Sequence, residues 1–216
     1  MLRTFVVWIT FAVLTSTING QPVDKLPRWV EYKGDIVKFT HRPLSPKEIE
    51  IYDRLLEQVT NLKFLEAKDP REFEQNLRIR MRAISELSQS PHVRLIKPLA
   101  NFIRKLQPYH DQLMSKYGWR GMLGGEVGIL TKCADEGVID LLIEFLGHPL
   151  REVRATALED LQKILRLPDG YRQGQLSWVS LEDANKRKEV VKFLSDWWQK
   201  NKGKIQIYWV NAWRIH

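Results

Sequence analysis

The sequence predicts an all-α fold made of helical hairpins, and three observations support that class. Helix-start signals, each joining a capping residue to a nearby proline or acid, occur five times along the chain. The segments after them carry apolar residues every three or four positions. No strand-like alternation of useful length occurs between residues 45 and 202. The length of 216 residues, with 44% hydrophobic and 28% charged side chains, suits one globular domain.

Residues 1–20 predict a secretory signal peptide. Arg3 provides a short basic start, an apolar run from Phe5 to Leu14 follows, and the remaining residues are mostly small or polar. The run is short for a membrane span, but an uncleaved N-terminal anchor is the alternative interpretation. The expected location is therefore periplasmic or extracellular, with association with the cell envelope as a further option.

Residues 21–44 predict an extended N-terminal arm, because prolines and a glycine interrupt them and no helical period is present. A short strand at 36–40 is a further expectation within this arm. The helical domain then occupies residues 45–202, and a C-terminal aromatic tail occupies residues 203–216.

The helix-start signals follow a common logic, in which a side chain accepts a free backbone N–H and proline takes the first helical position. They lie at Ser45–Glu48, Asp69–Glu72, Ser90–His92, His148–Glu152 and Ser180–Asp183. The helices expected from them and from the apolar spacing run over 46–66, 70–88, 91–106, 125–134, 137–146, 149–166 and 181–202.

The segment HPLREVRATALEDLQKIL, residues 148–165, has the most regular pattern in the chain. Its expected buried face holds Leu150, Val153, Ala157, Leu161 and Ile164, widened by Leu158 and Leu165. Its charged residues are expected to be solvated: Arg151, Glu152, Arg154, Glu159, Asp160 and Lys163. The preceding segment VIDLLIEFLG is nearly apolar all round, so other elements must cover it on several sides.

Together, residues 138–165 resemble a HEAT repeat in their apolar first helix, the turn with Pro149, Val153–Arg154, Ala157 and Leu161. Weaker similarity covers residues 93–106 and 193–205, the latter resembling the closing segment of small exported bacterial HEAT-like proteins. The resemblance implies a short, irregular α-solenoid of three or four hairpins that presents a binding surface. It carries no catalytic residues to transfer, and the long insert at 107–124 departs from a regular repeat.

The C-terminal end is unusually rich in tryptophan. Trp197, Trp198, Trp209 and Trp213 make up half of the eight tryptophans in the chain. One interpretation is an aromatic cap over the exposed end of the helical stack. The other is an aromatic patch for sugar, lipid or a protein partner. We expect the cap.

Few side chains suggest chemistry. Cys133 is the single cysteine, so no intrachain disulfide forms, and its apolar surroundings predict a buried small hydrophobe. The five histidines include no pair four residues apart, so we expect neither a metal site nor a cofactor. The glycine-rich segment 118–128 predicts a tight loop before a closely packed helix, with anion binding by backbone N–H groups as the alternative.

The leading functional hypothesis is a non-catalytic exported interaction module that binds a protein or peptide on its helical surface. Arg151, Arg154, Trp119 and Trp178 are the expected contact residues. The alternative is an envelope-associated protein whose basic surface (net charge +8) and tryptophan tail contact anionic lipid or cell-wall polysaccharide. Export argues against a nucleic acid partner. A hydrolase or lyase using residues 107–128 is disfavoured, because no catalytic constellation is visible.

Overall fold

The protein structure is a computed structural model that describes residues 30–33, 36–39, 42–62, 67, 69–108, 110, 125–165 and 181–212. The described residues hold seven α-helices, which confirms the all-α class: α1 (Pro46–Thr60), α2 (Pro70–Gln89), α3 (Ile96–Ile103), α5 (Gly125–Lys132), α6 (Gly137–Phe145), α7 (Arg151–Leu165) and α9 (Ala184–Asn201). Short 3-10 helices, η2 (Val93–Leu95) and η4 (Trp209–Ala212), accompany them.

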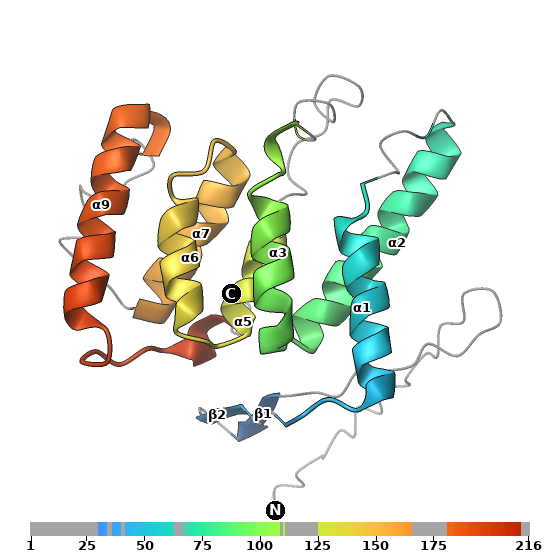
Figure 1. Cartoon of the computed structure of the whole chain (residues 1–216), viewed down its shortest axis with the longest axis horizontal. Helices are drawn as coiled ribbons and strands as arrows, with labels where there is room; N and C mark the ends of the chain where they lie inside the picture. The colour runs from blue at the N-terminus through green and yellow to red at the C-terminus, as the bar shows by residue number, and fades with distance from the viewer. Residues whose placement is uncertain are drawn as a thin grey trace, which may run out of the picture.

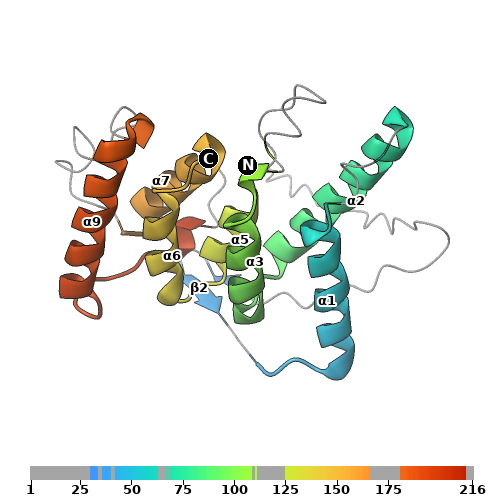
Figure 2. The ribbon, with the colours of Figure 1, turned by 45° about the horizontal axis from the view of Figure 1, so that its top comes forward.

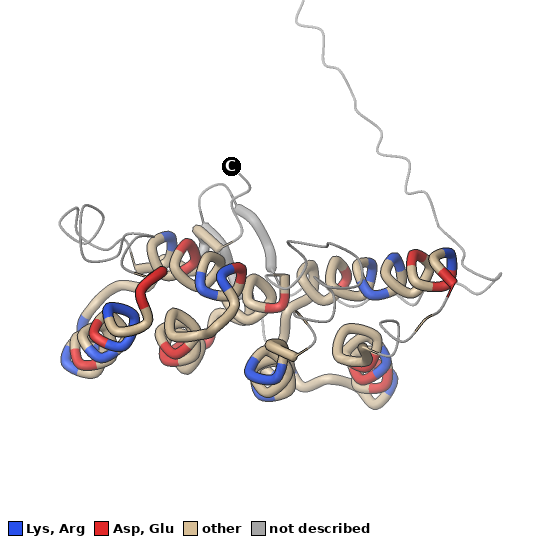
Figure 3. The backbone as a smooth tube through the Cα atoms, turned by 90° about the horizontal axis from the view of Figure 1, so that it is seen from above, with Lys and Arg blue, Asp and Glu red and all other residues tan. Residues whose placement is uncertain are grey.

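The helices form two layers. Seen from above in Figure 3, α1, α3, α6 and α9 make one row, and α2, α5 and α7 make the other. Helices of opposite layers pack in the pairs α1–α2, α3–α5 and α6–α7, and these hairpins stand side by side along the long axis (Figure 1). The tilted view in Figure 2 keeps the same order, with α9 at one end and the α1–α2 hairpin at the other.

Two predicted helix starts are confirmed by their caps. Ser45 accepts a hydrogen bond from the Glu48 N–H while the Glu48 carboxylate accepts one from the Ser45 N–H, which is the expected capping box. Asp69 accepts from the Arg71 N–H and precedes Pro70, the first residue of α2. These local signals worked because both partners of each cap lie within four residues of each other.

Two other helix starts differ from the prediction. His92, rather than Ser90, caps the segment before α3, and the α-helix itself begins at Ile96. Pro98 has no N–H to donate, so it fits only within the first turn of a helix. Asp183 caps α9 by accepting from two backbone N–H groups, so this helix begins at Ala184 rather than at residue 181.

A short β-hairpin accompanies the helical body. Strand β1 (Val30–Lys33) pairs antiparallel with β2 (Ile36–Phe39), and Val30 lies opposite Phe39. The short strand expected at 36–40 is thus present, and β1 is its additional partner strand. In Figure 1 the hairpin lies below the helices. The expected signal peptide, residues 1–20, lies outside the described residues.

The hydrophobic core lies between the two layers, and α5 is at its centre. This helix packs against α2, α3, α6, α7 and η4, and it is buried along most of its length. Gly125 begins α5 where a Cβ would lie 3.2 Å from Ile84 Cγ2, so the expected close packing after the glycine-rich segment is present. The seven apolar residues expected to be buried in 148–165 are all buried. In η2, Leu95 is buried and Val93 is 40% exposed.

Polar side chains connect neighbouring helices across the core. Arg80 of α2 forms a fully buried ion pair with Glu126 of α5, and its Nε donates to the Val59 carbonyl at 3.1 Å. Burial raises the pKa of Glu126, and the adjacent Arg80 guanidinium opposes that shift. The Arg80 guanidinium also lies 5.9 Å from the centroid of the Phe102 ring. One arginine therefore links α1, α2, α3 and α5.

Replacing Glu126 by alanine should lower the free energy of unfolding by about 3–5 kcal/mol, because it leaves a buried guanidinium without its counter-charge. The double change Arg80→Met with Glu126→Leu should recover most of that loss, since no buried charge then remains. Glu74→Ala, which breaks the exposed pair with Arg78 on the same helix, should have little effect. Urea unfolding followed by circular dichroism measures all three. Equal losses for Glu126→Ala and Glu74→Ala would contradict the prediction.

Candidate functional site

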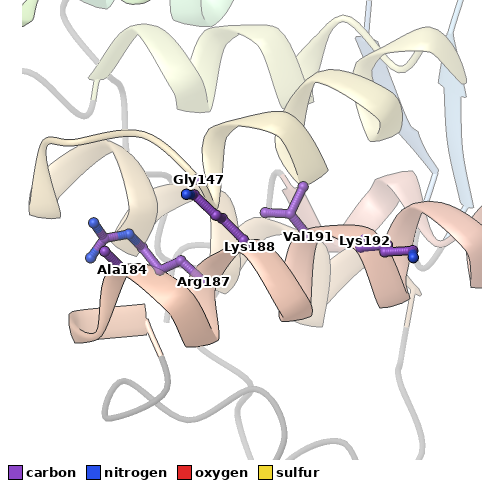
Figure 4. Close-up of a pocket in the computed structure, with 6 residues that line it drawn as sticks. All are labelled: Gly147, Ala184, Arg187, Lys188, Val191 and Lys192. Carbon is purple, nitrogen blue, oxygen red and sulfur yellow. The ribbon is translucent and has the colours of Figure 1, made fainter.

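A groove lies where the first half of α9 approaches the turn between α6 and α7. Gly147 contributes from the turn, and Ala184, Arg187, Lys188, Val191 and Lys192 contribute from α9. Its volume is about 330 Å³, near the lower end of the range for ligand pockets. In Figure 4 the cationic ends of Arg187 and Lys192 lie toward opposite ends of the groove, with Val191 between them.

The groove forms because two backbone features bring α9 close to the turn. The Asp183 cap starts α9 abruptly, and the pKa of Asp183 is lowered by the hydrogen bonds it accepts from the Lys186 and Asn185 N–H groups. At Gly147, a Cβ would lie 3.2 Å from the Glu144 carbonyl and 3.5 Å from Val191 Cγ2. A larger residue at this position would therefore push against the neighbouring helices.

The groove is strongly cationic. Helix α9 carries five lysine or arginine residues against two acids. Lys188 and Lys192 are exposed, and neither forms an ion pair within the described part of the chain. Arg187 is half-buried and donates to the carbonyls of Leu181 at 3.0 Å and Glu182 at 2.8 Å. Three cations around an apolar floor favour a ligand that carries several negative charges.

The four expected contact residues differ in their exposure and in whether the structure describes them. Arg151 is 70% exposed and lies 3.2 Å from Glu182 (Nε to Oε1), beside the start of α9. The expectation that Arg154 is exposed is wrong, since it is 4% exposed. It is buried because its Nη1 donates to the carbonyls of His148 at 2.8 Å and Pro149 at 2.7 Å, across the turn before α7. Trp119 and Trp178 lie outside the described residues.

Arg187, Lys188 and Lys192 were not among the expected contacts. The four-residue spacing of Lys188 and Lys192 in a predicted helix placed them on one face, which is a signal that the sequence contained. That spacing alone does not distinguish a groove from an ordinary solvated face. The groove exists because Gly147, from another hairpin, lies close to this face of α9.

Cys133 and His148 have structural roles. Cys133 is buried, as expected, and burial raises the pKa of its thiol well above the ordinary value. His148 accepts from the Leu150 N–H through Nδ1, so Nε2 carries the proton and donates to the Ile103 carbonyl at 3.0 Å. Burial lowers the pKa of His148. Among the described residues, no three His, Cys, Asp or Glu side chains are placed to share a metal ion.

The described tryptophans of the C-terminal end pack inward. Trp198 is fully buried, and Trp197 and Trp209 are partly buried against the core. The chain after α9 returns to the body, where the Tyr208 N–H donates to the Ile164 carbonyl and Asn211 Nδ2 donates to the Lys163 carbonyl, both at 2.7 Å. Trp213 lies outside the described residues.

Comparison of the chain with protein-family models, with curated proteins and with solved structures finds no match. Among the described helices, none is both long enough and apolar enough to cross a bilayer. The assignment of the groove beside α9 as the candidate site therefore rests on its geometry and charge alone.

Asp160 of α7 is buried, although the sequence predicts that it is exposed to solvent. It is 8% exposed, because α7 turns it toward α5. Its Oδ2 lies 2.6 Å from Thr131 Oγ1, which also lies 3.3 Å from the Val127 carbonyl. Thr131 has one hydroxyl proton, so both contacts are hydrogen bonds only when the Asp160 carboxyl is protonated and donates. Burial raises the pKa of Asp160 from 3.8 to about 6, against the opposing effects of Thr131 and Lys163.

The raised pKa predicts a pH-dependent stability. The folded chain binds this proton more tightly than the unfolded chain, so the contribution of Asp160 is complete below pH ~4 and is lost as the pH rises through ~6. Asp160→Asn should therefore gain stability relative to wild type over that interval, by at most about 3 kcal/mol.

Urea unfolding at several pH values between about 4 and 7 measures this difference. Asp196→Asn, which removes an exposed carboxylate from α9, is the control for net charge. A difference between Asp160→Asn and wild type that stays constant over the interval would contradict the prediction.

Proposed function

We propose that this chain is a non-catalytic, exported interaction module whose groove beside α9 binds an acidic peptide segment of a partner protein. The proposal includes a short, irregular HEAT-like α-solenoid as its frame. The side-by-side hairpins α1–α2, α3–α5 and α6–α7 support that frame, with α9 closing one end. The C-terminal aromatic residues would act as a cap, which the burial of Trp198 favours.

The observation that carries the proposal is a set of cations along one concave surface, none of which forms an ion pair with an acid of the described residues. Lys188 and Lys192 lie one turn apart on α9, and Arg187 lies at the other end of the groove. The floor between them is apolar, since Val191, Ala184 and Gly147 form it. An extended peptide with acidic side chains would place its carboxylates on the cations and its backbone over this floor.

The peptide is favoured over a lipid surface or a polysaccharide by two features. A groove with its own floor accommodates a narrow chain better than a flat membrane surface. The membrane hypothesis also requires accessible tryptophans, but Trp198 has no exposed surface and Trp197 and Trp209 are partly buried. A basic surface remains common to both hypotheses, so the test includes vesicles.

The test uses the full chain, a fluorescein-labelled hexaglutamate peptide and fluorescence anisotropy at low salt. Reversing both groove lysines, Lys188→Glu with Lys192→Glu, should weaken binding by about tenfold or more, because two attractive contacts become repulsive. The matched control is Lys97→Glu with Lys105→Glu, which changes net charge equally at exposed positions on and just after α3. The control should retain most of the affinity.

Three outcomes would overturn the proposal. The first is that hexaglutamate does not bind. The second is that the groove and control variants lose affinity equally, which would show a general charge effect. The third is sedimentation with phosphatidylglycerol vesicles without peptide binding, which would favour the envelope hypothesis instead.

A further inference from the structure

Three arginines converge beside the groove around one acid. Arg151 and Arg154 come from α7 and Arg187 comes from α9, while Glu182 lies on the short segment before α9. Glu182 Oε1 lies 3.2 Å from Arg151 Nε, and Oε2 lies 3.8 Å from Arg154 Nη2. Arg187 donates to the Glu182 backbone carbonyl at 2.8 Å. The cluster and the groove therefore share Arg187.

Arg154 is the unusual member because it is a buried cation with incomplete partners. Its Nη1 is used by the turn before α7, but its Nε is buried without a hydrogen-bond partner in the described part of the chain. Burial lowers the pKa of Arg154, Arg187 lowers it further, and Glu182 opposes both effects. A buried charge is costly unless it is paired and hydrogen-bonded. Arg154 therefore favours a closer anion than it has.

Glu182 is a distant partner for Arg154. Its side chain is 53% exposed, and its 3.8 Å approach to Arg154 is longer than a hydrogen bond. The Glu182 carboxylate lies beside the guanidinium groups of Arg151 and Arg154, and the Arg187 guanidinium donates to its backbone carbonyl. Arg151 is 70% exposed, so a carboxylate that enters from solvent is able to take bidentate geometry on its guanidinium, which adds energy and specificity.

We propose that Arg151 and Arg154 form a carboxylate subsite of the groove, and that Glu182 occupies this subsite until a ligand carboxylate displaces it. The inference rests on the proposed function and extends it. The ligand is an acidic peptide with one carboxylate on the arginine subsite and further carboxylates along Lys188 and Lys192. Glu182 thereby competes with the ligand from within the chain. The apparent affinity for the peptide is therefore proportional to the fraction of molecules whose subsite is free of Glu182.

The test measures hexaglutamate binding by Glu182→Gln, with Glu189→Gln as its matched control. Both changes remove one exposed negative charge, but Glu189 lies on α9 and has no part in the cluster. Glu182→Gln should tighten binding about fivefold to tenfold, because it vacates the subsite. Glu189→Gln should change binding by about twofold or less, as a general charge effect.

A second change decides whether the gain comes from the arginine subsite. Arg151 is mostly exposed, so Arg151→Gln should not disturb folding. Adding Arg151→Gln to Glu182→Gln should remove most of the gain in affinity. Unchanged thermal unfolding of each variant verifies that the fold is retained.

The outcomes separate the two proposals. Equal gains for Glu182→Gln and Glu189→Gln would overturn the subsite and leave the groove as the peptide site. A gain for Glu182→Gln that survives the addition of Arg151→Gln would also overturn the subsite. If no variant binds hexaglutamate, both proposals fail together.

Discussion

The burial of α5 is the constraint on which the rest of the structure depends. A helix of eight residues, Gly125–Lys132, is held on several sides by α2, α3, α6, α7 and η4. Its polar side chains must therefore find partners inside the protein. Glu126 pairs with Arg80 and Thr131 contacts Asp160, so the two polar contacts tie α5 to the helices on either side of it in the same layer. Shifting α5 by one residue would break both contacts and expose apolar neighbours.

The opposite layer is joined by more exposed contacts. Arg104 donates to both Glu144 oxygens at 2.7 Å, which links the end of α3 to α6. Asp140 of α6 accepts from Gln199 at 3.0 Å and from Lys202 at 3.1 Å, which links α6 to α9. These contacts join each helix to its neighbour at the surface, although exposed pairs contribute little to stability. The position of α9 on α6 in turn determines the width of the groove.

The candidate site is a consequence of this lateral arrangement. Gly147 belongs to the turn after α6, and Lys188 and Lys192 belong to α9, so no single hairpin contains the groove. The arginine cluster has the same origin, since α7 and α9 each contribute to it. The absence of a side chain at Gly147 and the start of α9 at Ala184, directly after its Asp183 cap, bring these parts together.

The sequence by itself determined the class of fold, most helix bounds and the buried stripe of α7, because caps and apolar spacing act within a few residues. It also predicted the buried Cys133 from its apolar surroundings. It did not distinguish Arg154 and Asp160 from the solvated charges beside them, since all six lie between the apolar positions of one helix. Tertiary structure determined the burial of these two residues. Arg154 donates to the carbonyls of His148 and Pro149 in the turn, and Asp160 contacts Thr131 of α5. The groove was likewise decided only by packing, since its cations and its floor come from segments that meet across different hairpins.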